Sequence, residues 1–269
     1  MTTPVTLSDA ACRVLNTADP AEKVRLTYAY AHEWRAGNIA EIGTSSPPDR
    51  PARPVKPVLC PPSDMPKRSA GGGKRRTNLI HAIAHIELNA IDLAWDAVAR
   101  FAPLNLPKAF YDDWVRVAED EARHFEMLQN RLVELGASYG DIPAHDGLWE
   151  AALNTNDDVL ARMALAPMLL EARGLDTTPA TVERLRANGD DATADIFELI
   201  GEEEISHVAA GVRWFEYVCE QRHLPPTPTF KSLVRERYKG QIKPPFNVPA
   251  RTQAGMRADY YEPDCAAKA

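Results

Sequence analysis

The pattern Glu-x-x-His occurs three times in this chain of 269 residues, beginning at Glu121, Glu204 and Glu220. Residues three apart share one face of an α-helix, so the carboxylate and the imidazole of one copy can reach the same metal ion. Oxygen and nitrogen donors in this ratio suit iron or manganese, whereas zinc favours four ligands of nitrogen or sulfur type. The residues that could do chemistry are therefore those of a helical carboxylate–histidine metal site.

Two of the copies lie inside the apolar stripe of an amphipathic helix. The first stripe comprises Trp114, Val117, Glu121, His124, Leu128, Leu132 and Leu135. The second comprises Phe197, Ile200, Gly201, Glu204, His207, Val208, Gly211 and Phe215. Two further apolar stripes each have one glutamate at their centre, Glu87 and Glu171. This periodicity predicts that four glutamates and two histidines face a helical core.

Four carboxylates in one core need compensating cations, because an isolated buried carboxylate costs several kcal/mol even after the protein relaxes. Two divalent ions would neutralise four glutamates whose histidine partners are neutral. The alternative to a metal site is a set of polar core residues that satisfy one another's hydrogen bonds. We predict the metal ligands to be Glu87, Glu121, His124, Glu171, Glu204 and His207.

Other histidines fit this pattern less well. The third copy, Glu220 to His223, has no partner glutamate at its height and precedes two prolines, so we expect a helix end with His223 near the last carbonyls. His81 and His85 lie one turn apart, on the far side of their helix from Glu87. We expect these two at the surface or in a layer behind the ligands. His32 and His145 carry no pattern.

Four helices must position the ligands, and their expected ranges are 78–101, 108–135, 157–174 and 190–221. Glu87 lies 17 residues before Leu104, the centre of the first loop, and Glu121 lies 17 residues after it. At about 1.5 Å per residue, both would be about 25 Å from that turn. Glu171 and Glu204 are similarly placed about a second loop, at 188. A kink is expected at Pro167, and a short separate helix, capped by Thr178 with Pro179 at its start, should join the last two.

Proline divides the rest of the chain. Eight of the 22 prolines lie between Pro47 and Pro66, and seven between Pro225 and Pro263, so we expect two extended arms. Asp19 should cap a helix that begins at Pro20 and runs to about Gly37. The predicted domains are an N-terminal helical segment (1–46), a proline-rich arm (47–76), a four-helix bundle (77–223) and a C-terminal arm (224–269) that packs on the bundle. The expected fold class is all-α.

Charge follows the same division. Residues 50–76 hold eight bases and one acid, a net charge of +7, and residues 231–251 hold six bases and one acid, +5. Residues 77–230 hold 11 bases and 27 acids, −16, within a chain whose net charge is −7. Basic arms that pack across an acidic bundle explain this distribution, and arms that clamp an anionic substrate are the alternative. The overall acidity argues against a general nucleic-acid binder, with tRNA kept as a minor option.

Cysteine usage and the N-terminus bear on the compartment. The four cysteines, Cys12, Cys60, Cys219 and Cys265, form no C-x-x-C pair and are expected to be reduced thiols. The first nine residues lack the basic and apolar regions of a signal peptide. The most apolar stretch, residues 160–170, is too short to span a bilayer. These features predict a cytoplasmic protein.

The ligand set resembles that of ferritin-like di-iron carboxylate proteins, in which two helices each supply one Glu and two each supply Glu-x-x-His. The resemblance covers residues 77–223. The segments 85–92 (HIELNAID), 171–176 (EARGLD) and 243–251 (KPPFNVPAR) are similar to a bacterial ferritin-like family known as domain of unknown function 455. A more distant similarity is to the di-iron hydroxylases that modify tRNA. The family pattern implies that Glu121 and Glu204 bridge the metals. It also implies that Asp120 and Glu203 each accept a proton from the opposite pair's histidine and so fix its tautomer.

These expectations define three classes of function. The first is a di-iron or iron–manganese oxygenase or hydroxylase that activates O₂, with an unknown substrate, for which an anion is one option, an external electron donor and no organic cofactor. The second is iron storage or peroxide detoxification. The third is a metal-bound binding protein without turnover. A monomer or dimer would favour the first class over a storage shell, for which the arms would be superfluous.

Overall fold

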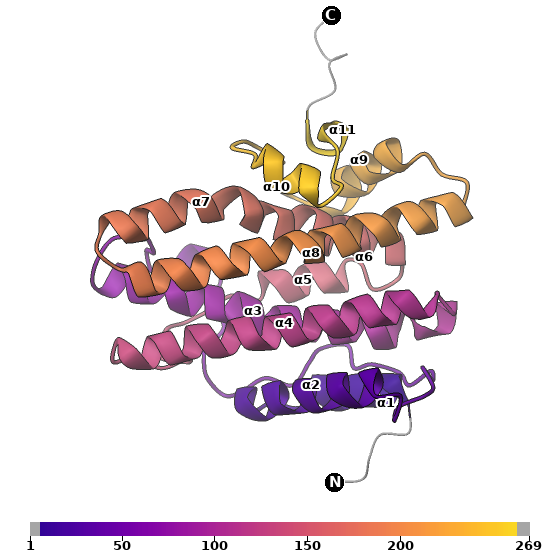
Figure 1. Ribbon diagram of the computed structural model, residues 1–269, viewed down its shortest axis with the longest axis horizontal. Helices are drawn as coiled ribbons and strands as arrows, with labels where there is room; N and C mark the ends of the chain where they lie inside the picture. The colour runs from indigo at the N-terminus through magenta and orange to yellow at the C-terminus, as the bar shows by residue number, and fades with distance from the viewer. Residues whose placement is uncertain (1–5, 263–269) are drawn as a thin grey trace, which may run out of the picture. The chain divides into compact units, whose positions relative to one another are not determined.

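A computed structural model describes residues 6–262 (Figure 1). Its regular structure confirms the all-α class: no strand occurs within residues 6–262, where one isolated bridge joins Leu59 and Ala144. The chain forms two compact units, unit 1 up to Glu150 and unit 2 from Ala151. Cys265 and residues 1–5, on which the cysteine and signal-peptide predictions partly rest, lie outside the described residues. Cys12, Cys60 and Cys219 are free thiols.

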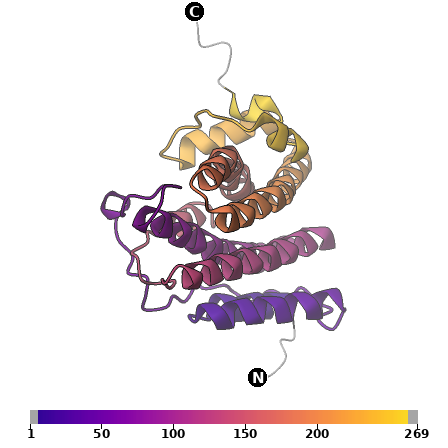
Figure 2. The same ribbon diagram turned by 60° about the vertical axis from the view of Figure 1, so that its left-hand side comes forward.

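Unit 1 contains two pairs of helices. These are α1 (Leu7–Leu15), α2 (Pro20–Arg35), α3 (Lys74–Arg100) and α4 (Lys108–Glu134), with short 3₁₀ turns η1 (Pro62–Asp64) and η2 (Ala102–Leu104). α3 packs side by side with α4, while α1 packs on α3 and α2 packs on α4 (Figures 1 and 2). The short helix α5 (Gly147–Leu153) contains the division between the units.

The predicted capping of α2 is confirmed. The Asp19 side chain accepts a hydrogen bond from the Glu22 backbone N–H, and Pro20 occupies the first helical position, where its missing N–H costs nothing. α1 was not predicted; its cap is Thr6, whose hydroxyl accepts from the Asp9 N–H. Two helices therefore precede the first proline-rich stretch.

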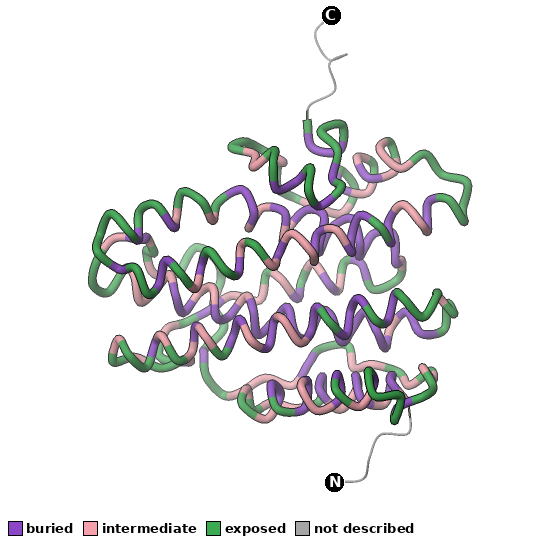
Figure 3. Tube along the Cα trace, viewed as in Figure 1, coloured by how far each residue is buried: buried purple, intermediate pink, exposed green. Residues whose placement is uncertain are grey.

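The hairpin of α3 and α4 holds the first half of the predicted ligand set. The buried residues of α4 form a stripe along one face (Figure 3), and Glu121 and His124 lie within it. α3 is buried more completely than α4. α1 packs against it, and the Trp95 indole N–H of α3 donates to the Thr27 hydroxyl of α2 at 3.0 Å. The N-terminal helices thus cover the back of the helix that carries Glu87.

Unit 2 is built on a second helical hairpin. Its elements are α6 (Val159–Leu165), the π-helix η3 (Ala166–Glu171), α7 (Ala172–Ala187), α8 (Asp191–Gln221), α9 (Pro226–Arg237), α10 (Val248–Gln253) and α11 (Ala258–Tyr261). α7 lies beside α8 in both views (Figures 1 and 2), and α6 and η3 continue the same side of the hairpin. The Asp190 carboxylate caps α8 by accepting from the Thr193 N–H.

The predicted break at Thr178 and Pro179 is wrong, because both residues lie inside α7. Thr178 is not a cap: its hydroxyl donates to the Gly174 carbonyl at 2.9 Å. Pro179 has no N–H to give to the Leu175 carbonyl four residues earlier. The Asn247 side-chain amide donates to that carbonyl at 3.1 Å instead. The helix continues because a residue 72 positions away replaces the missing donor.

The extended conformation predicted for the C-terminal arm is wrong for much of residues 226–261, where α9, α10 and α11 form. Prolines lie in the first turns of α9 and α10, the positions that tolerate a missing N–H. Proline content therefore marked helix starts as well as loops.

The first proline-rich arm is non-helical except for η1 and the residues from Lys74 that begin α3. Two of its bases, Arg50 and Arg53, pair with acids of unit 1. Arg50 lies 2.5 Å from both Asp146 and Glu150, which supports the packing interpretation of this arm's charge.

Among residues 6–262, no helix has the length and apolar character needed to cross a membrane.

Candidate metal centre

The first cluster consists of Glu87 from α3 and of Glu121 and His124 from α4. One donor atom from each lies within 4.8 Å of the others. His124 Nδ1 is 3.3 Å from Glu87 Oε2 and 3.4 Å from Glu121 Oε2. Glu121 and His124 are completely buried. Helical spacing of three residues on α4 and the hairpin with α3 thus bring the three groups together as predicted.

Burial and mutual charge dominate the electrostatics of the first cluster. Desolvation, reinforced by the negative charge of Glu121, raises the pKa of Glu87 well above its ordinary value. Burial by itself lowers the pKa of His124, but the neighbouring carboxylates of Glu121 and Glu87 raise it well above its usual value. Without a metal ion, the cluster therefore retains protons that a cation would displace.

The second cluster consists of Glu171 at the end of η3 and of Glu204 and His207 from α8. One donor atom from each again lies within 4.8 Å of the others. His207 Nδ1 is 3.6 Å from Glu204 Oε2, and His207 is completely buried. The two clusters have the same composition, one glutamate from one helix and Glu-x-x-His from its hairpin partner.

A π-helix places Glu171. Pro167 was predicted to kink the helix here, and the chain instead widens into η3, the kind of local distortion often found at functional sites. Gly211 of α8 allows this, because a Cβ atom there would lie 2.5 Å from Pro167 Cβ. Gly201 does the same opposite Thr178, whose Cγ2 would be 2.8 Å from an added Cβ. Two glycines of α8 thus let it approach the side of the hairpin that carries Glu171.

The C-terminal segment braces the helix that follows Glu171. The buried Arg251 guanidinium donates to both oxygens of Asp176, at 2.9 and 2.7 Å, in a bidentate pair. The same group contacts the Ala172 carbonyl at 3.4 Å. The Asn247 backbone N–H donates to Asp176 at 2.9 Å. These residues belong to the 171–176 and 243–251 segments singled out in the sequence, and the structure shows that the two segments pack together.

The donor atoms fit a bound cation. Glu87 Oε2 and Glu204 Oε2 are buried and accept no hydrogen bond. A buried carboxylate oxygen without a donor is costly, and a metal ion removes that cost. Carboxylate oxygens and imidazole nitrogens are donors that iron and manganese accept. Each cluster could therefore hold a metal ion.

The remaining predicted residues are placed as follows. Asp120 is half-buried and accepts from Arg123 on its own helix at 2.8 Å, and Glu203 is also half-buried. Their roles toward the histidines stay predictions. His223 is exposed just beyond the end of α8, with φ of 55° and its N–H donating to the Glu220 carbonyl, so the third Glu-x-x-His copy is a helix end as expected.

His81 and His85 are not at the surface but buried on the back of α3. His81 Nε2 accepts from the Gly140 N–H at 2.9 Å, and His85 Nδ1 lies 2.8 Å from the Tyr139 hydroxyl. Burial lowers the pKa of His81 to about 4 and that of His85 to about 3. Both rings are therefore neutral at pH 7, and their polar partners lie in the loop that follows α4.

A buried ion pair continues this polar face and was missed in the sequence. Lys23 of α2 bonds Asp92 of α3, and both side chains are almost completely buried. Arg53 of the first arm lies 3.5 Å from the other Asp92 oxygen and also bonds Asn89. In the sequence, the one sign of this ion pair was that Asp92 lies on the same helix face as His85. The partners of Asp92 come from distant segments of the chain.

The fold and the two clusters define an all-α protein with buried carboxylate–histidine groups able to hold metal. A family model described as "Protein of unknown function (DUF455)" matches residues 16–262, and the chain belongs to this family. The chain is 39% identical over 252 residues to an "Uncharacterized protein" of Haemophilus influenzae, covering 90% of this chain and 88% of that protein. No solved structure matches the chain.

Proposed function

We propose that this protein is a ferritin-like di-iron carboxylate enzyme that activates O₂ to oxidise a substrate, as an oxygenase or hydroxylase. The single observation that carries the proposal is the repetition of one incomplete ligand set. Each unit offers two glutamates and one histidine, and each buries a glutamate oxygen that accepts no hydrogen bond. Three side chains leave coordination positions of an iron ion open, and two such sets together match the six-ligand pattern of a dinuclear carboxylate site.

In this proposal the two clusters would together hold two ions, and Glu121 and Glu204 would be the ligands that both ions share. The four carboxylates supply four negative charges that balance two ferrous ions. Two ferrous ions, when bound, supply electrons for the reduction of O₂, and an external donor restores them. The protein's own contribution is to hold the ligands in a dry environment and to release the protons of the first cluster as metal enters.

The test is anaerobic titration with Fe(II), followed by exposure to O₂ and optical spectroscopy. We expect two iron ions per chain and an absorption change on oxidation. Glu121→Ala and His207→Ala should each lower the bound iron. His223→Ala is the matched control, because it alters a Glu-x-x-His copy at an exposed helix end and should leave iron binding unchanged. Equal iron binding by the parent and both ligand variants would refute the site.

Oligomeric state separates this function from iron storage. We expect size-exclusion chromatography to give a monomer or dimer. A closed shell of many subunits that mineralises iron would instead support storage.

A further inference from the structure

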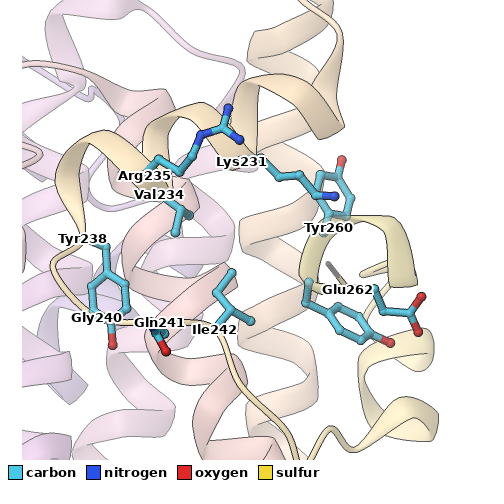
Figure 4. A pocket seen from close by; sticks show the side chains of 10 residues that line it. Lys231, Val234, Arg235, Tyr238, Gly240, Gln241, Ile242, Tyr260 and Glu262 are labelled. Carbon is cyan, nitrogen blue, oxygen red and sulfur yellow. The ribbon is translucent and has the colours of Figure 1, made fainter. Parts of the chain in front are cut away.

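Unit 2 has a surface pocket of about 460 Å³ among α9, residues 238–242 and α11 (Figure 4). This volume is within the range of small-molecule sites. Tyr238 and Tyr260 lie on opposite sides of it, with Val234 and Ile242 between them. The pocket thus offers apolar and aromatic walls that none of the predicted metal ligands forms.

The walls differ in rigidity. Tyr260 is fully buried, and its hydroxyl donates to Glu216 at 2.6 Å. Its ring also packs edge-on against Phe230, with centroids 5.3 Å apart. Tyr238 is only half-buried, and its ring lies over Gly240, where an added Cβ would be 2.5 Å from Tyr238 Cζ. One wall is therefore fixed, and the other is a ring whose position depends on the absence of a side chain at residue 240.

One arginine indicates the charge of the ligand. Arg235 of α9 lies at an edge of the pocket, and Glu262 is the acid among the lining residues (Figure 4). The neighbouring Arg237, Arg251 and Arg257 each pair with a carboxylate. Arg235 has no such partner among the described residues and is exposed. A guanidinium in this state can bind a carboxylate or phosphate in the bidentate manner.

We propose that this pocket binds a small organic anion with a flat ring, its carboxylate or phosphate held by Arg235 and its ring against Tyr238. The flat ring matches the tyrosine face and the apolar side chains beneath it. This site belongs to unit 2 alone and does not depend on metal binding.

The experiment is calorimetric titration of the full-length, metal-free protein with adenosine monophosphate and with benzoate, which separate phosphate from carboxylate recognition. Uncharged adenosine is the ligand control. We expect saturable binding of at least one anion, weakening several-fold between about 20 mM and about 200 mM salt, because exposed charges are screened. Adenosine should bind at least about tenfold more weakly, since it lacks the charge-assisted contacts.

Variants locate the site. Arg235→Gln keeps the stem but removes the charge, and Gly240→Ala displaces the Tyr238 ring; each should weaken binding by about tenfold. Lys239→Gln is the matched control, because it removes a base from the same segment but outside the pocket lining. Circular dichroism shows whether each variant folds. The proposal fails if neither anion binds at millimolar concentration, if adenosine binds as well as the anions, or if Arg235→Gln and Lys239→Gln behave alike.

Discussion

At the scale of single residues, the charged groups inside unit 1 divide into two kinds. Glu87 of α3 and Glu121 and His124 of α4 lie against one another and could hold a cation. Those on the back, such as Lys23 and Asp92, already have their counter-charges. Spacing alone predicted the first kind, because helix periodicity decides which residues share a face. It could not predict the second, because Lys23 and Asp92 are 69 residues apart.

Asp92→Asn should be strongly destabilising. The change leaves Lys23 and Arg53 facing a neutral amide in a buried site, and removing one partner of a buried pair costs about 3–5 kcal/mol. Chemical denaturation measures this loss in the free energy of unfolding. Glu134→Gln breaks the exposed pair with Arg131 and should cost less than about 1 kcal/mol. Similar losses in both variants would mean that the buried pair contributes no more than a surface one.

His81 predicts a dependence of stability on pH. Its pKa is lowered by burial to about 4, below the value near 6.5 of an unfolded chain. The unfolded state therefore binds the proton first as pH falls, and the stability present above about pH 6.5 declines toward pH 4, by roughly 3 kcal/mol at most. His81→Gln keeps an acceptor for the Gly140 N–H and should flatten this part of the profile in urea unfolding measured between pH 7 and 4. An unchanged slope would contradict the assignment.

At the scale of elements, period and capping predicted α2, α3, α4 and α8 closely. The same reasoning failed at α7, since a local rule places a helix start at Pro179 and cannot see the distant Asn247 amide that satisfies Leu175. It also missed α9, α10 and α11; the prolines of α9 and α10 occupy permitted first-turn positions. The failures share a physical cause: tertiary contacts decide whether a proline ends a helix or is accommodated by one.

The C-terminal brace should affect metal binding at the second cluster. Arg251→Lys loses the bidentate pair with Asp176, and Asn247→Ala leaves the Leu175 carbonyl without its donor. Partners that orient ligands typically change metal affinity by about 10–100-fold, and we expect a loss of at least about tenfold for each variant. Cobalt(II) absorption spectra report both affinity and ligand geometry. Arg257→Lys, at an exposed ion pair, is the control and should retain the parent spectrum.

At the scale of the whole molecule, the proposed function requires the two clusters to act as one. Metal binding can distinguish a shared site from two separate ones. Separate clusters would each bind one ion independently, and a shared site would bind two ions together.

A double-mutant cycle tests the sharing. If Glu121 and Glu204 bridge the same pair of ions, either alanine substitution weakens both ions, and the double variant loses much less than the sum of the single losses. If the clusters are separate, Glu121→Ala leaves one tightly bound iron per chain and the losses add. Iron stoichiometry and binding isotherms of the four proteins distinguish the cases.

The Asn247 amide that completes α7 also affects when this helix can gain all of its hydrogen bonds during protein synthesis. A ribosome makes Leu175 long before Asn247, with 72 residues of sequence separation between them. While the chain grows, the carbonyl exposed by Pro179 has no donor from the chain, and Asp176 lacks Arg251. Domains fold from the N-terminus during translation, so unit 1 can fold before residues 247–251 are made. The helix that follows Glu171 consequently gains its brace only after Asn247 and Arg251 have been synthesised, and a metal ion bound at the second cluster before then would be held without it.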